Sequence, residues 1–178
     1  MTHKTVRRAL LAVVLLTASA TTQALELEDC RISIGPGYPG TAARCGTMTR
    51  PENPDDPASP GIELRVAVVP ALNLVPETDA VVPIAGGPGQ GSVEFYLSVQ
   101  GAFEGLHRNR DILLVDQRGT GASSRMDCPI EDEALLFETE FTLEDTLEYM
   151  QECLESLPHD PRYFTTSIAV TDLEAVRE

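Results

Sequence analysis

Basic residues are scarce in this sequence. Its 178 residues include 13 Lys and Arg against 28 Asp and Glu, which gives a formal net charge of −15 at neutral pH. The one local concentration of positive charge, residues 107–110, holds two arginines and is followed directly by Asp111. Binding to nucleic acid needs a basic stripe that neutralises phosphates, so we expect no nucleic-acid partner. The acidity is instead typical of a protein kept soluble by its charge.

Zinc-ligand spacing is also missing. No Cys-x-x-Cys motif occurs, and the histidines His107 and His159 stand apart from the cysteines. The chain is therefore predicted to hold no metal. Neither histidine is a candidate general base: His107 falls at the end of an expected helix, and His159 falls in the turn 158–161.

The first 24 residues resemble a secretory signal peptide. Lys4, Arg7 and Arg8 precede an apolar run, residues 9–16, that is too short to span a bilayer. Small residues allow cleavage after Ala20 or after Ala24, and the acidic segment that follows favours the second. An uncleaved anchor is the alternative. Cleavage leaves 10 basic and 28 acidic residues, a net charge of −18, on a protein exported to the periplasm or the exterior, with no membrane contact.

The four cysteines all follow this leader. Three pairings are formally possible, and proximity in sequence favours two local disulfides of roughly 3 kcal/mol each. Export makes such bonds plausible. The predicted pairs are Cys30 with Cys45 and Cys128 with Cys153.

After the leader the chain divides by composition into two parts. Residues 25–61 are expected to be an entry segment pinned by its disulfide, and its stretch 34–60, dense in Gly and Pro, is predicted to be loop. From residue 62 onward the pattern is that of a folded domain, 62–178. Residues 62–68 alternate as a strand with one buried face. The apolar runs 80–85 and 111–116 suggest strands buried on both faces, as in parallel sheets, although Pro83 argues against a central position for the first.

Three helices are expected. Residues 92–106 have the length of a crossover helix. A second helix begins at the capping box Thr142 to Asp145 and carries an apolar stripe as far as Leu157. A third begins near Thr166 and continues to the last residue without a cap, so we expect a truncated chain. Asp172 and Glu174 on this helix are interpreted as a solvated or packing face.

Residues 86–91, Gly-Gly-Pro-Gly-Gln-Gly, follow the first apolar run and precede the first helix. Such an arrangement points backbone N–H groups at one place and favours an anion. A nucleotide-binding P-loop would need a lysine after the last glycine, and a dinucleotide fingerprint needs a different glycine spacing. We therefore expect no nucleotide cofactor. The remaining interpretations are a site for a transient oxyanion and a bare turn.

Residues 116–123, Asp-Gln-Arg-Gly-Thr-Gly-Ala-Ser, directly follow the second apolar run. Asp116 and Arg118 could pair and hold the loop, and the glycines would permit turns that other residues resist. A catalytic carboxylate at Asp116 is the less favoured interpretation. The segment is predicted to be loop architecture.

Together the two motifs resemble the paired loops of the proline iminopeptidase family of α/β-hydrolases. Residues 85–89 are similar to its His-Gly-Gly-Pro-Gly loop, with Ala85 in place of His, and residues 116–123 to its Asp-Gln-Arg-Gly-x-Gly-x-Ser loop. Residues 43–47 resemble its secreted tripeptidyl aminopeptidase branch. The resemblance implies an incomplete α/β-hydrolase fold with a mainly parallel sheet. It assigns oxyanion donors to Gly86 or Gly87, and structural loop roles to Pro88, Gly89, Asp116, Gln117, Arg118, Gly119, Gly121 and Ser123.

The nucleophile of that family is missing from these residues. No serine lies within Gly-x-Ser-x-Gly, and the Asp and His that would follow it are likewise not identifiable. The sequence therefore predicts the amino-terminal fragment of an exported serine aminopeptidase, itself inactive, acting in its complete form on peptides. An esterase of the same fold is the close alternative. The alternative of another class is a complete, non-catalytic exported binding module.

Overall fold

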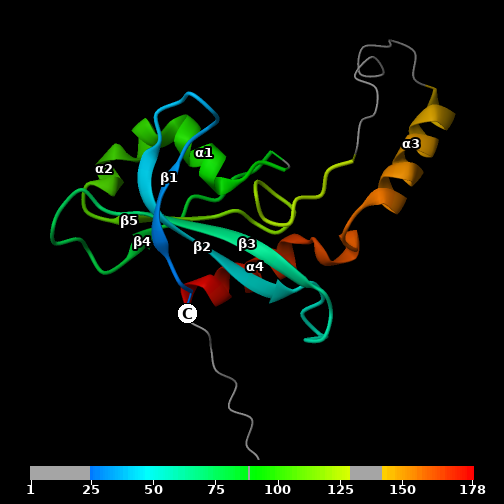
Figure 1. The fold of residues 1–178 in the computed structure, drawn as a ribbon, viewed down its shortest axis with the longest axis horizontal. Helices are drawn as coiled ribbons and strands as arrows, with labels where there is room; N and C mark the ends of the chain where they lie inside the picture. Colours follow the sequence, from blue (N-terminus) through cyan, green and yellow to red (C-terminus); the bar gives the residue numbers. More distant parts are fainter. Residues whose placement is uncertain (1–24, 88, 129–141) are drawn as a thin grey trace, which may run out of the picture.

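The computed structural model describes residues 25–87, 89–128 and 142–178, so the predicted leader, residues 1–24, lies outside it. Five strands form one sheet in the order β1-β2-β3-β5-β4 (Figure 1). The strands are β1 (Glu28–Ile32), β2 (Thr41–Pro51), β3 (Gly61–Val69), β4 (Ala80–Val81) and β5 (Asp111–Val115). The helices are α1 (Ser92–Val99), the 3-10 helix η1 (Gln100–Phe103), α2 (Glu104–His107), α3 (Leu143–Ser156), the 3-10 helix η3 (Pro161–Tyr163) and α4 (Thr166–Arg177).

The sheet is mixed and mostly antiparallel, so the prediction of an incomplete α/β-hydrolase fold with a mainly parallel sheet is wrong. β1 pairs antiparallel with β2, β2 with β3, and β3 with β5. Among the described strands only β4 and β5 run parallel, joined by the crossover that contains α1. The short connections that join β1 to β2 and β2 to β3 turn the chain back on itself, which makes those pairs antiparallel.

Residues 34–60 of the entry segment are predicted to be loop, and this is wrong over 41–51, which form β2. β2 runs for 11 residues between β1 and β3, and Ala43 is its one buried residue. Its sequence has no alternating apolar face, and it pairs with a strand on each side. The Pro-rich stretch is a true loop, 52–60, closed by the Glu52 N–H donating to the Pro60 carbonyl at 2.8 Å.

The first apolar run, predicted as a strand buried on both faces over residues 80–85, forms only the two-residue β4. Val82 and Ile84 are largely exposed, and β4 lies at one end of the strand order. Pro83 has no N–H to donate to a neighbouring strand, which limits the length of pairing. The predicted strands at 62–68 and 111–116 are confirmed as β3 and β5, and Pro70 follows the end of β3.

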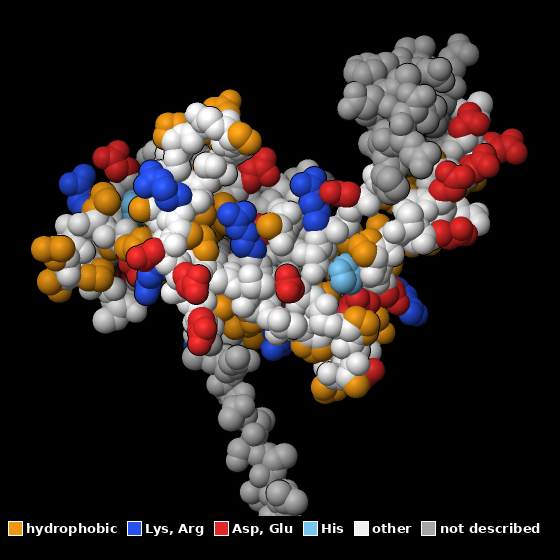
Figure 2. All heavy atoms as spheres, viewed as in Figure 1, with side chains coloured by type: hydrophobic (Ala, Val, Ile, Leu, Met, Phe, Trp, Pro, Cys, Tyr) orange, Lys and Arg blue, Asp and Glu red, His pale blue; other side chains and the backbone are white. Residues whose placement is uncertain are grey.

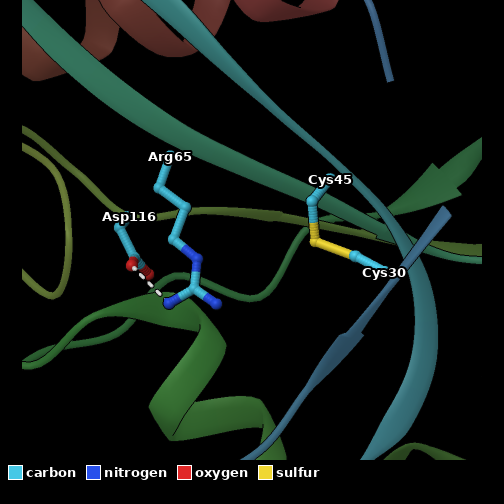
Figure 3. Close-up of a disulfide and its surroundings, with 4 residues drawn as sticks. All are labelled: Cys30, Cys45, Arg65 and Asp116. Carbon is cyan, nitrogen blue, oxygen red and sulfur yellow. Dashed lines mark ion pairs between the residues drawn. A yellow bond between two sulfur atoms is a disulfide. The ribbon is translucent and has the colours of Figure 1, made fainter. Parts of the chain in front are cut away.

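The core lies between the sheet and the helices on its two faces. α1 and α4 lie on opposite faces of the sheet (Figures 1 and 3). Tyr96 of α1 is 1% exposed and packs with residues of β3 and β5. The members of this core cluster are Ile32, Ala43, Ala67, Val69, Val93, Tyr96, Ile112 and Leu114. The predicted crossover helix 92–106 is divided into α1, η1 and α2.

Both predicted disulfides are present in the structure. Cys30 and Cys45 join β1 to β2 (Figure 3), and Cys128 and Cys153 join the segment after β5 to α3. Disulfides indicate an oxidising, exported environment. In the part of the chain that the structure describes, no helix is long and apolar enough to cross a membrane.

The capping box predicted for the second helix is confirmed at the start of α3. The Thr142 side chain accepts from the Asp145 N–H at 3.2 Å, and the Asp145 carboxylate accepts from the Thr142 N–H at 3.0 Å. The Thr142 hydroxyl also donates to the Asp145 carboxylate at 2.7 Å, and this bond first, then that of the Thr142 N–H, holds the pKa of Asp145 below its ordinary value. α3 projects away from the sheet (Figure 1), and none of its residues is buried.

Candidate functional site

The glycine loop, residues 86–91, leads from the segment after β4 into α1. Gly86 and Gly87 are both exposed, and Gly87 has φ +128°, a conformation that side-chain-bearing residues rarely adopt. No hydrogen bond between described residues uses the N–H group of either glycine. Pro88 lies outside the described residues. The loop therefore presents two backbone donors to solvent next to a helix.

Asp116 is the internal anion at the start of this helix. Its carboxylate is 1% exposed, and its Oδ1 accepts from the Val93 N–H, in the first turn of α1, at 3.0 Å. Its Oδ2 accepts from the Ala122 N–H at 3.1 Å and lies 3.9 Å from Arg65 Nη1 (Figure 3). A carboxylate in this position satisfies a free helix N–H and the positive end of the helix dipole. Asp116 therefore already occupies one donor of the first turn of α1, whereas no hydrogen bond between described residues uses the N–H groups of Gly86 and Gly87 in the loop before it.

Two glycines are required because the Asp116 carboxylate lies directly against the backbone. A Cβ added at Gly91 would meet Asp116 Oδ1 at 2.6 Å, and one added at Gly121 would meet Asp116 Cγ at the same distance. The Cα atoms of these two glycines face one another, with each hypothetical Cβ within 3.0 Å of the other Cα. The glycines of the second motif thus allow close approach as well as turning.

Residues 116–123 hold the glycine loop at two further points. The Gln117 side-chain amide donates to the Ala85 carbonyl at 3.4 Å, just before Gly86, and the Gly121 N–H donates to the Gly89 carbonyl at 3.5 Å. Ser123, fully buried, donates to the Asp116 carbonyl at 2.6 Å and accepts from the Arg65 N–H at 2.7 Å, which fixes the loop to β3. Residues 116–123 therefore hold the glycine loop, residues 86–91, in place.

Arg118 pairs with Asp172 of α4 rather than with Asp116, so the suggested pairing within the loop does not form. Its Nε and Nη2 donate to the two carboxylate oxygens of Asp172 at 2.7 and 2.9 Å. Its Nη1 donates to the carbonyls of Glu52 and Tyr163, each at 2.9 Å. Arg118 and Asp172 are almost completely buried, and this bidentate pair attaches α4 to the loop after β5.

Gly119 belongs to the same junction. A Cβ at Gly119 would meet the ring of Phe164 at 2.9 Å, and the Arg118 guanidinium lies 5.8 Å from the centre of that ring. The end of the second motif is thus packed against the segment that leads into α4.

Neither histidine lies in the glycine loop. His107 Nε2 lies 2.9 Å from the Pro70 carbonyl, and His159 Nδ1 lies 2.8 Å from Glu52 Oε2. Glu52 is largely buried, and its Oε1 also accepts from the Asp160 N–H at 3.1 Å. His159 and Glu52 therefore join the β2–β3 loop to the turn before α4, which is a structural role.

Two buried carboxylates in these contacts, Glu52 and Asp172, were not assigned a partner from the sequence. Asp172 had a detectable signal, because it falls between Ala169 and Leu173 on the apolar stripe of its helix. A charge inside such a stripe needs a buried partner. Glu52 had no such signal in the sequence, since it lies in a Pro-rich loop with no apolar pattern around it.

The described residues contain no group of three or more His, Cys, Asp or Glu that could hold a metal ion. Comparison of the chain with protein-family models found no match, and comparison with curated proteins found no similar protein. The candidate site therefore consists of backbone donors at Gly86 and Gly87 and the residues that brace them. Fixed backbone donors of this kind can stabilise an oxygen on which negative charge develops.

Proposed function

We propose that this chain is the amino-terminal part of an exported serine aminopeptidase, similar to proline iminopeptidases and tripeptidyl aminopeptidases, and that its glycine loop forms one side of the oxyanion hole. The observation that carries the proposal is the pair of exposed glycines, Gly86 and Gly87, whose N–H groups are used by no hydrogen bond between described residues and whose loop is held by contacts from residues 116–123. The two sequence motifs that support the resemblance are in contact at Gly89 and Gly121.

The contacts that hold the glycine loop would suit its N–H groups to stabilising an oxyanion. An oxyanion donor is effective when it is fixed before the reaction, because no energy is then spent on orienting it as charge develops. Gln117 holds the carbonyl before Gly86, and Asp116 holds the helix after the loop. In the complete enzyme a serine from residues other than these 178 would attack the substrate carbonyl, with a histidine accepting its proton.

The proposed site of action is the periplasm or the exterior, on the amino termini of peptides. The resemblance favours peptide substrates, and simple esters are the competing substrate class. The disulfides support an oxidising compartment.

The first test is the coding sequence beyond Glu178. A Gly-x-Ser-x-Gly motif within about 15 to 25 codons supports the proposal. A stop codon directly after Glu178 would overturn the enzyme assignment and favour the non-catalytic binding module. The 178-residue chain alone should show no turnover, and its stoichiometric labelling by a fluorophosphonate probe would contradict the proposal.

The second test uses the protein encoded by the whole gene. Gly86→Pro removes one N–H, whereas Gly86→Ala retains it, and a Cβ at this position meets no atom within 4 Å. We expect Gly86→Pro to lower kcat by on the order of a hundredfold if Gly86 is the donor, with Gly86→Ala close to the unmodified enzyme. Prolyl and tripeptidyl amides assayed beside simple esters separate peptidase from esterase. Equal activity of the two variants would assign the donor elsewhere, with Gly87 the next position tested.

A further inference from the structure

Arg65 of β3 contacts the loop after β5 with its backbone and approaches it with its side chain. Its N–H donates to Ser123 Oγ at 2.7 Å, and its carbonyl accepts from the Asp116 N–H at 3.1 Å. Its guanidinium points towards the Asp116 carboxylate, with Nη1 3.9 Å from Oδ2 (Figure 3). The Arg65 side chain is 35% exposed, and no hydrogen bond between described residues uses its guanidinium. Arg65 therefore acts on Asp116 through its charge rather than through a directed bond.

The Asp116 carboxylate needs a counter-charge because it is 1% exposed. Among the described residues, Arg65 is the one cation within ion-pair distance of it. Arg118, on the same loop, pairs with Asp172, and Glu94, in the first turn of α1, is exposed and acidic. Basic residues are few in this chain, and acidic side chains run along α3 in Figure 2. Arg65 is therefore the group that favours the ionised form of Asp116.

The ionised form of Asp116 holds the start of α1. Its two oxygens accept from the N–H groups of Val93 and Ala122, one each. Protonation would turn one oxygen into a donor, weaken both bonds and remove the negative charge at the positive end of the helix. Gly91, where the loop 86–91 meets α1, lies directly against this carboxylate. Loss of the charge on Asp116 would therefore free the glycine loop to move.

We infer that Arg65 is a positioning residue of the oxyanion site: its charge keeps Asp116 ionised, and ionised Asp116 fixes the glycine loop before the reaction. The inference rests on the proposed function, because it concerns the same backbone N–H groups. It assigns Arg65 no contact with the substrate. Donors that are fixed in advance act mainly on the transition state, so loss of the Arg65 charge should change kcat more than KM.

Kinetics of the protein encoded by the whole gene test this role. Arg65→Met keeps the aliphatic part of the side chain without its charge, and it should lower kcat by about tenfold while KM stays within about twofold. Arg65→Lys keeps the charge and should retain most of the activity. Arg44→Met, at an exposed arginine of β2 that forms no ion pair with a described residue, is the matched control and should leave kcat unchanged. Equal losses in Arg65→Met and Arg65→Lys, or no loss in Arg65→Met, overturn the inference.

A second measurement follows Asp116 itself and needs no activity. In proton–nitrogen correlation spectra of the same proteins, the N–H resonances of Val93 and Ala122 report the charge of the carboxylate that accepts from them. On acidification these resonances should change at a higher pH in Arg65→Met than in the unmodified protein, because loss of a nearby cation disfavours the charged carboxylate. An unchanged midpoint overturns the inference. Arg65→Gln takes the place of Arg65→Met in both experiments if the latter does not fold.

Failure of this inference is distinguishable from failure of the proposed function. A complete protein with no peptidase or esterase activity overturns the proposed function, and this inference with it. An active enzyme in which Arg65→Met moves the midpoint but leaves kcat unchanged overturns this inference alone, since Arg65 would then balance Asp116 without positioning the site.

Discussion

Asp172 connects α4 to the rest of the molecule through its buried pair with Arg118 and a longer contact, 3.4 Å, from Arg50 Nε, and its removal makes a quantitative prediction. Asp172→Ala removes both acceptors of the Arg118 Nε and Nη2 groups. The side chains of Arg118 and Asp172 are 1% and 3% exposed, so bulk water has little access to the guanidinium. The variant leaves a buried guanidinium without its counter-charge.

The expected cost follows from the partners that remain. Removing one partner of a buried ion pair typically costs 3–5 kcal/mol. Arg118 keeps two carbonyl acceptors, those of Glu52 and Tyr163, and the ring of Phe164, so the lower end of that range applies. We expect a loss of about 3 kcal/mol, which for a chain of this length lowers Tm by roughly 6–12 °C.

Thermal unfolding followed by far-UV circular dichroism measures the effect. Glu174→Ala, on the same helix, removes an exposed carboxylate that is paired with Arg177, and it should leave Tm unchanged. The double variant Arg118→Met/Asp172→Leu should lose less stability than Asp172→Ala, because it buries no unpaired charge. The reasoning is refuted if Asp172→Ala melts with the unmodified protein.

Two further predictions concern a glycine and a cap. Gly121→Ala should lower the free energy of unfolding by about 1–3 kcal/mol, because its Cβ would meet Asp116 Cγ at 2.6 Å and the residue has φ +53°. Gly105→Ala on α2 is the control: its Cβ would meet no atom within 4 Å, so it should be neutral or slightly stabilising. Urea unfolding of the two variants measures both effects. The pKa of Asp145 is lowered in the folded protein, so its contribution to α3 is complete above its ordinary value of 3.8 and is lost as the pH falls through the lower folded pKa. Helical circular dichroism should therefore decrease below about pH 4, and less so in Thr142→Val; an equal decrease in both proteins would exclude the cap as its cause.

Local patterns that depend on neighbouring residues were predicted correctly. The capping box at Thr142, the alternating strand that became β3 and the two local disulfides each involve groups close in sequence. Preferences of short segments define the cap and the strand, and proximity in sequence favoured the two cysteine pairs. The same reasoning identified the glycine loop and the loop after β5.

The direction and extent of the sheet were not predictable in this way. β2 has no apolar alternation, and its place between β1 and β3 depends on hydrogen bonds to both strands. Val82 and Ile84 belong to an apolar run, yet they are exposed because the pairing of β4 ends at Val81. Strand pairing joins residues far apart in sequence, so the pattern of one strand does not reveal its partner.

The sequence by itself determined the acidity, the cysteine pairs, the capped helix and two glycine-rich loops that follow apolar runs. Only the tertiary structure decided which groups of the two loops, residues 86–91 and 116–123, are in contact. It placed Asp116 against Val93 at the start of α1 and paired Arg118 with Asp172. Gly86 and Gly87 are exposed, and no hydrogen bond between described residues uses their N–H groups. The physical reason is that a buried charge is paired by whichever group the fold brings within reach, and for Arg118 that group lies 54 residues away.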